Sequence, residues 1–273
     1  SDVYKRQNVA TVGGTDVLGK GHSLGLKATY TVPNAGNWWH SFSAGFDLKN
    51  NREALTLKNS SDEVPLKYAP ITLSYSGLRQ AEKSQYGVGV SLVIGTRSFF
   101  SYGSDQLQFD YKRYKSSPSF MVLKTDLNGT YTFDGGSQLA FRFNGQLTDS
   151  PLVSSEQIAG GGMNSVRGYL SAEATGDYGV VGSIEWRTPP LTWLNPWVEG
   201  WRASAFFDGA RLRLKNPLPE QADRFALASV GLGTTFKVGP YFSGRIDVGR
   251  PLKDGPRTKK GDTQVNFSIN ASY

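Results

Sequence analysis

The feature that most constrains the fold is an alternation of apolar and polar residues, repeated along the chain in runs of about ten residues. At the C-terminus, Val265, Phe267 and Ile269 alternate with polar residues such as Asn266 and Ser268. A strand with this pattern places one face in an apolar medium and the other face in a polar one. Runs of about ten residues match a tilted membrane strand and exceed the roughly five or six residues typical of soluble sheets. The alternation therefore predicts an all-β, antiparallel transmembrane β-barrel.

The connections between these runs alternate between short and long. Outer-membrane barrels have short periplasmic turns and long extracellular loops, so we expect the chain in a bacterial outer membrane with its C-terminus in the periplasm. About eleven strands and a partial strand near Val9–Gly13 can be read, which makes about 12 in all. The strands are expected to begin near Leu24, Trp38, Leu66, Tyr86, Met121, Leu139, Tyr178, Trp201, Ala226 and Phe242, with long loops at residues 50–65, 98–118, 150–175 and 251–261.

Aromatic residues gather near the strand ends on the expected periplasmic side. Such residues form girdles at the two interfaces of membrane barrels. The expected girdle residues are Trp38, Trp39, Trp193, Trp197, Trp201 and Tyr241.

Composition excludes several classes of protein. The 273 residues include no Cys, so a disulfide framework, a Cys-based zinc site and a Cys nucleophile are all excluded. No apolar run is long enough for a membrane helix. The formal charge of +7 comes from scattered Lys and Arg, which argues against nucleic acid and favours solvated loops or contact with anionic lipopolysaccharide. The small basic clusters are Lys112, Arg113 and Lys115, and Arg257, Lys259 and Lys260.

The N-terminal residues 1–7 fit no pattern in the rest of the chain. They carry Asp2, Lys5 and Arg6 and lack the apolar core of a signal peptide. We expect residues 1–7 to be a leader foreign to the natural sequence and residues 8–273 to form the C-terminal portion of the barrel.

One long connection, between residues 151 and 190, carries a motif unlike the other loops. Its residues are Ser155-Glu156-Gln157, Gly161-Gly162, Ser165-Val166-Arg167-Gly168-Tyr169, Gly176-Asp177-Tyr178-Gly179 and Glu185-Trp186-Arg187-Thr188-Pro189. With this motif, the chain resembles the transporter component of bacterial two-partner secretion, the haemolysin and filamentous-haemagglutinin secretion/activation family of the Omp85 superfamily. Outside this connection, the resemblance extends to Gly14 through Ser23, to Lys112-Arg113-Tyr114-Lys115 and to Phe206-Phe207-Asp208.

The resemblance implies that this loop folds into the lumen of a barrel of about sixteen strands. It also implies that the Arg at the loop tip, Arg167, contacts an acidic residue on the inner wall. Asp208 is the expected partner, because alternation puts it on the strand face of Ser204 and Phe206, away from Phe207. Glu185, on the polar face of its own strand, is a second candidate. A desolvated, charge-assisted pair of this kind could hold the loop in one position.

One departure from the family pattern concerns the wall. The family often has Gly two residues after the wall Asp, whereas this chain has Ala210 there and Gly209 one position earlier. The close approach of the loop to the wall is therefore expected to differ here.

The resemblance further implies a pore that passes one large unfolded exoprotein to the cell surface without nucleotide, cofactor, metal or small-molecule substrate. The periplasmic POTRA domains that recognise the client in this family, and about four initial strands, are not found in this sequence. Since unpaired strand edges are costly in lipid, we expect such a piece to be inactive alone.

Three alternatives stay open. An insertase of the same superfamily shares the Val-Arg-Gly-Tyr loop, although the upstream elements favour secretion. The barrel of a surface lipase would need a nucleophile, a base and an orienting group, yet His22 and His40 are the only imidazoles and no Gly-x-Ser-x-Gly elbow accompanies them. A simple diffusion porin would not need the inward-folding loop.

Overall fold

The computed structural model describes residues 7–11, 15–57, 60–96, 102–192, 198–239 and 241–271. Within these residues, twelve strands form one antiparallel sheet in which each strand pairs with its neighbours along the chain, apart from an insertion between β7 and β10. The expected all-β antiparallel class and the expected number of about 12 readable strands are therefore confirmed. The strands are β1 (Gln7–Thr11), β2 (Thr15–Ala35), β3 (Trp38–Leu57), β4 (Ser60–Gln80), β5 (Ser84–Thr96), β6 (Met121–Thr132), β7 (Gln138–Thr148), β10 (Tyr178–Arg187), β11 (Val198–Arg213), β12 (Arg224–Val238), β13 (Phe242–Pro251) and β14 (Gln264–Ala271).

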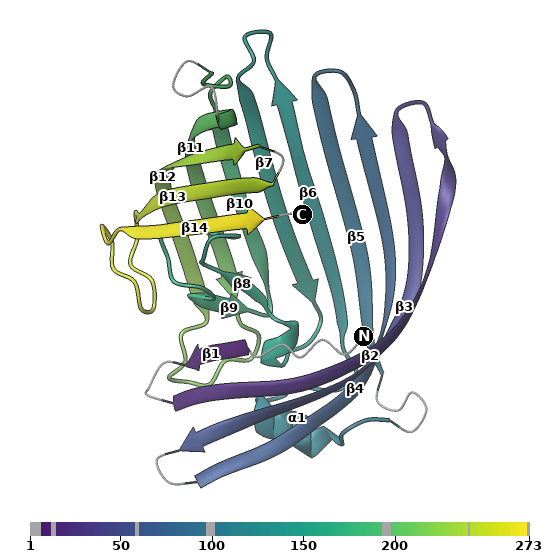
Figure 1. Cartoon of the computed structure of the whole chain (residues 1–273). Helices are drawn as coiled ribbons and strands as arrows, with labels where there is room; N and C mark the ends of the chain where they lie inside the picture. Colours follow the sequence, from purple (N-terminus) through teal and green to yellow (C-terminus); the bar gives the residue numbers. More distant parts are fainter. Residues whose placement is uncertain are drawn as a thin grey trace.

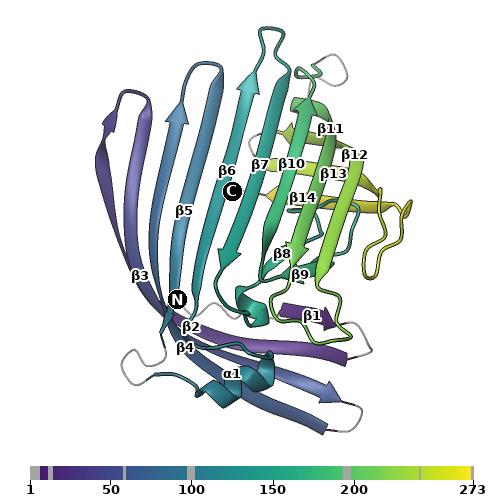
Figure 2. The ribbon, with the colours of Figure 1, turned by 180° about the vertical axis from the view of Figure 1, so that it is seen from behind.

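The sheet curls round, and the short strands β8 (Ile158–Gly160) and β9 (Ala174–Gly176) lie on its concave side (Figures 1 and 2). These two strands pair only with each other and contact β10, β11 and β12. Among the described residues, no pairing joins β1 to β14. Within the same residues, no helix is both long and apolar enough to cross a membrane.

The two faces of the sheet have the reverse of the polarity found in a water-soluble protein. On β10, Ile184 and Trp186 are exposed, whereas Ser183 and Glu185 are buried. Outer-membrane barrels show this inside-out arrangement, with an apolar outer face and a polar interior. The outer face also exposes Leu24, Leu26, Phe42, Leu73, Leu127, Phe143, Phe207, Leu232, Ile246, Val265, Phe267 and Ile269.

The prediction of a long loop at residues 50–65 is wrong. β3 continues to Leu57 and β4 begins at Ser60, and the two strands stay in register as far as that pair. Backbone pairing does not require apolar side chains, so it continues past the end of the alternating pattern that the sequence shows. The girdle residues Trp193 and Trp197 lie outside the described residues.

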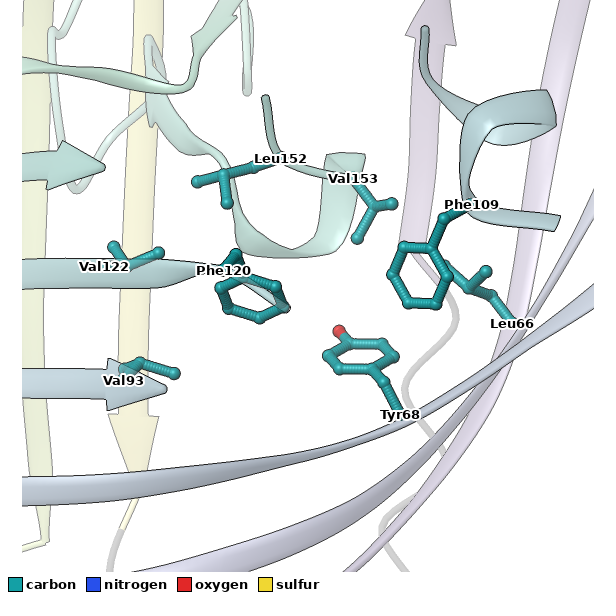
Figure 3. Close-up of a cluster of buried hydrophobic side chains, with 8 residues drawn as sticks. All are labelled: Leu66, Tyr68, Val93, Phe109, Phe120, Val122, Leu152 and Val153. Carbon is teal, nitrogen blue, oxygen red and sulfur yellow. The ribbon is translucent and has the colours of Figure 1, made fainter. Parts of the chain in front are cut away.

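The connection between β5 and β6 contains a short helix, α1 (Gln106–Lys112), that alternation did not predict. A capping box begins it: Asp105 accepts a hydrogen bond from the backbone of Gln108, whose side chain accepts one from the backbone of Asp105. Phe109 on α1 is fully buried against Tyr68, in the cluster that Figure 3 shows. Its other members are Leu66, Val93, Phe120, Val122, Leu152 and Val153.

Candidate functional site

The connection between β7 and β10, residues 149–177, is here called the motif loop. It begins at the cluster of Figure 3, through Leu152 and Val153, and then passes through β8, a tight tip and β9. A second apolar cluster fixes the tip against the wall. Its buried members are Val166 and Tyr169 from the tip, Ala174 from β9, and Val181, Ala210, Leu212 and Leu227 from the wall strands.

Glycines allow the tight turns of this loop. Gly161, Gly162 and Gly168 all have positive φ values, between 96° and 108°, a region that costs any other residue strain. A Cβ on Gly168 would lie 3.0 Å from the carbonyl carbon of Gly249 on β13. The loop tip therefore lies backbone to backbone against the wall at this point.

Arg167, at the tip, is buried in a ring of acidic and hydroxyl groups. Its Nε and Nη2 donate to the two carboxylate oxygens of Asp208 at 2.7 and 2.8 Å, and its backbone N–H donates to the same carboxylate at 3.0 Å. Nη1 donates to Glu185 at 2.5 Å and Nη2 to Ser183 at 3.1 Å. The structure thus places both acidic residues named from the sequence in contact with Arg167. The bidentate geometry is the strongest that an Arg–carboxylate pair offers.

A third carboxylate, that of Asp247 on β13, was missed by the sequence reasoning. It accepts from Arg167 Nη1 at 3.2 Å and is almost fully buried. Its strand alternates apolar Ile246 and Val248 with polar Arg245 and Asp247, so the polar face was readable, but no signal linked it to the loop. Arg245 bonds both Asp247 and Glu185, which brings a further positive charge to the ring.

Cations and carboxylates meet in this ring, and Arg142 on β7 lies within electrostatic reach of Asp208 and Glu185. Arg167 and Arg245, with Arg187 on Glu185, oppose the three carboxylates of Glu185, Asp208 and Asp247. Burial alone would lower the pKa of the Arg167 guanidinium, but the hydrogen bonds and charges of Asp208 and Glu185 outweigh burial and raise that pKa above its ordinary value. Arg167 is therefore a permanent cation. Its guanidinium carbon also lies 3.4 Å from the ring centroid of Phe206, a close cation–π contact.

The tip residues beside Arg167 make the remaining contacts. Val166 is fully buried, and the Tyr169 hydroxyl lies 2.8 Å from the carbonyl oxygen of Lys253 and 3.0 Å from that of Ala228, so it can donate to either. Ala210 does not keep the loop away from the wall: a Cβ on Gly160 would lie only 3.2 Å from the methyl carbon of Ala210.

Asp177, at the end of the motif loop, joins three connections. Its fully buried carboxylate accepts from the backbone N–H groups of Leu152 and Lys215, from the Gln157 side chain, and from Arg113 after α1 at 3.2 Å. A Cβ on the neighbouring Gly176 would lie 2.8 Å from the backbone nitrogen of Arg213. The Arg of the basic cluster at residues 112–115, Arg113, thus makes an ion pair within the fold.

Glu156, in the 3-10 turn Ser154–Glu156, belongs to the motif named from the sequence, but its charged contact was not predicted. Its carboxylate is almost fully buried, accepts from Lys49 Nζ at 2.5 Å and from the Tyr68 hydroxyl at 2.7 Å, and lies 3.6 Å from Lys124. Burial alone would raise the pKa of this carboxyl, but Lys49 and Lys124 together lower it below its ordinary value. Gln146 on β7 also donates to the carbonyl oxygen of Glu156. The start of the loop is thus attached to β3–β7, and its tip to β10–β13.

Glu173 attaches the returning arm of the loop to the connection between β13 and β14. Its carboxylate accepts from the backbone N–H groups of Arg257 and Thr258 at 2.6 and 2.8 Å, and from the Thr258 hydroxyl at 2.8 Å. Arg257 also donates to the carbonyl oxygens of Ser171 and Ala172. The Arg of the second basic cluster, Arg257, therefore also binds the motif loop.

The histidines lie elsewhere. His40 Nδ1 is 2.8 Å from the Tyr75 hydroxyl, and its ring stacks with those of Trp38 and Tyr75 on the wall. The described residues contain no group of three His, Cys, Asp or Glu side chains that could hold a metal ion.

Comparisons with solved structures agree with the fold. CdiB from Escherichia coli matches with a TM-score of 0.78 and 16% identity, over 98% of this chain and 48% of that protein. CdiB from Acinetobacter baumannii matches with a TM-score of 0.72 and 20% identity, over 98% and 46%. BamA from Haemophilus ducreyi lacking POTRA domains 1-3 matches with a TM-score of 0.64 and 14% identity, over 99% and 62%. The chain spans about half the length of either CdiB protein.

No curated protein matches the sequence significantly. A family model, that of the haemolysin secretion/activation protein ShlB/FhaC/HecB, matches residues 2–236. This match covers most of the sequence and includes the whole motif loop, so the chain belongs to the ShlB/FhaC/HecB family of haemolysin secretion/activation proteins.

Proposed function

We propose that this chain forms the greater part of an outer-membrane pore that secretes and activates a large exoprotein of the haemolysin or adhesin type by two-partner secretion. Family membership supports the outer-membrane location and the transport role. The alternating lengths of the connections support an orientation with the motif loop on the extracellular side and the C-terminus in the periplasm. The partners are then the secreted exoprotein and the lipid and lipopolysaccharide of the membrane.

The observation that carries the proposal is the motif loop inside the curve of the sheet, with Arg167 buried among three carboxylates. A buried ion network costs desolvation and adds little net stability, so its benefit is a single, defined loop position. In a pore, a loop held in this way occupies space through which the client must pass. We infer that Arg167, Asp208, Glu185 and Asp247 set the closed position of the loop, and that client passage requires the loop to be displaced or reshaped.

The test is a secretion assay. In a strain that lacks the gene, the full-length protein is supplied as wild type or as Arg167→Ala, and the exoprotein is measured in the medium and in the periplasm. We expect wild type to restore secretion, and Arg167→Ala to accumulate normally in the outer membrane yet secrete much less. Secretion that does not depend on the full-length protein would contradict the proposal.

A second candidate function, insertion of other barrels into the membrane, is favoured only by the likeness to BamA, and at 14% identity that likeness extends to the fold alone. The same strain separates the two functions. An insertase predicts that many outer-membrane proteins decrease when the gene is deleted, whereas a two-partner transporter predicts that only the client is lost from the medium.

A further inference from the structure

Three exposed arginines lie together on the outer face of the sheet: Arg211 and Arg213 on β11, and Arg224 on β12. We call them the arginine patch. Arg213 and Arg224 are direct partners in the antiparallel pairing, and Arg211 pairs with Ala226, two residues along β12 from Arg224. Directly opposite residues have Cβ atoms about 5 Å apart, and diagonal neighbours lie about 7–8 Å apart. All three guanidinium groups can therefore reach one ligand.

The positive charge of this patch is only partly compensated. Arg224 has one ion pair, to Asp223 at 3.4 Å, and both of these side chains are exposed. Among the described residues, no carboxylate pairs with Arg211 or Arg213. Like charges directly opposite each other destabilise a sheet. By contrast, the interior arginines Arg167 and Arg245 are both paired with carboxylates.

The patch lies where the apolar band of the outer face ends. Arg211 and Arg213 share a strand face with Trp201 and Phe207, and Phe207 is 51% exposed. Ten residues separate Trp201 from Arg211, which at ~3.3 Å per residue and a tilt of ~40° amounts to ~25 Å, about the height of the apolar band in an outer-membrane barrel. If Trp201 marks one interface, Arg211 marks the other.

We propose that the arginine patch binds the phosphate groups of lipid A, the membrane anchor of lipopolysaccharide. A guanidinium group binds phosphate through two parallel hydrogen bonds, and several such groups on a rigid sheet suit a headgroup with more than one phosphate. The acyl chains of the same lipid would cover exposed apolar residues nearer the middle of the strands, including Ile184, Phe207 and Leu232. This inference rests on the outer-membrane location and orientation proposed above, and it assigns the lipid contact to a part of the chain distinct from the two basic clusters in the loops.

The test measures lipid binding to the purified full-length protein. Wild type and the triple variant Arg211→Gln/Arg213→Gln/Arg224→Gln are titrated with lipid A, with dephosphorylated lipid A and with inorganic phosphate, and bound lipid is counted by native mass spectrometry. The control variant Lys253→Gln/Lys259→Gln/Lys260→Gln removes the same formal charge from exposed positions in the connection between β13 and β14.

Each basic residue near an anionic membrane surface contributes about fivefold in affinity, so the patch variant should bind lipid A on the order of 100-fold more weakly. The control variant should bind close to wild type, dephosphorylated lipid A should bind weakly to every variant, and inorganic phosphate should not compete at matched concentration. Equal binding of lipid A by the patch variant and wild type would overturn the proposal, as would equal binding of the two lipids by wild type.

Two further measurements keep the result clear. If the Gln variant does not fold, the matching Arg→Lys variant retains the charge and should still bind lipid A more tightly than dephosphorylated lipid A; equal binding of the two lipids by this variant would count against a phosphate site. If secretion falls in the Gln variant while lipid A binding is unchanged, the patch acts on the client and the lipid proposal is wrong. If lipid binding falls while secretion persists, the proposed function stands independently of the patch.

Discussion

Replacement of Arg167 by Ala should release the tip of the motif loop. In the variant, Glu185 and Asp247 keep their ion pairs to Arg187 and Arg245. The fully buried Asp208 loses Arg167, the one side chain among the described residues that donates to it, and keeps only the backbone N–H at position 167. Removing one partner of a buried ion pair costs about 3–5 kcal/mol, because the remaining charge is left without compensation. Tenfold in an equilibrium constant corresponds to about 1.4 kcal/mol, so the docked position should lose a factor on the order of 100 to 3,000 relative to the released one.

The released loop can be measured by limited proteolysis of the full-length protein in detergent, with cleavage mapped to residues 149–177. Where the loop opens and closes faster than the protease cuts, the cleavage rate follows the population of the open form. The rate should rise at least about 100-fold in Arg167→Ala. Asp208→Asn in the Arg167→Ala background should recover part of the loss, since it neutralises the carboxylate that was left unpaired.

Arg187→Ala is the matched control. Arg187 belongs to the same ring, but its side chain is 29% exposed and it makes one ion pair, to Glu185. Exposed or partly exposed pairs contribute about 0–1 kcal/mol, so its cleavage rate should stay within about fivefold of wild type. The reasoning is refuted if Arg167→Ala and Arg187→Ala are cleaved at the same rate.

Three further predictions use the same cleavage assay. Gly249→Ala should also release the tip, because its Cβ would lie 2.6 Å from the backbone nitrogen of Gly168, whereas Gly209→Ala, with no atom nearer than 3.6 Å, should not. Glu156→Lys and Lys49→Glu should each loosen the start of the loop through like-charge contact, and the double variant should restore part of the protection; two additive losses would argue against a direct pair. The pKa of the Glu156 carboxyl is lowered in the docked loop, so its stabilisation of that loop is complete above the ordinary pKa of 4.5 and is lost as the pH falls below that value. Below pH 4.5, the protease resistance of the motif loop should therefore depend less on pH in Glu156→Gln than in wild type.

Much of the fold was readable because a strand has a local signature. Side chains alternate with period two, so the sequence alone assigned the strands of the twelve-stranded sheet, although not β8 and β9, and the face on which Asp208 and Glu185 lie. The capped helix after β5 and the extension of β3 and β4 were not readable. Alternation is absent from both segments, and a short helix held by Phe109 depends on the apolar cluster into which that ring packs.

The pairing of charges was decided by tertiary structure. Arg167 and Asp247 are 80 residues apart, Arg113 and Asp177 are 64 apart, and Lys49 and Glu156 are 107 apart. The register of every intervening strand and the curvature of the sheet decide which polar face contacts the loop. Neither property can be read from the sequence of a single strand. The sequence by itself determined that the interior is polar and that an Arg lies at the loop tip. Only the curled sheet decided that this Arg meets three carboxylates and that the start of the loop is held by other strands of the wall, β3 to β7.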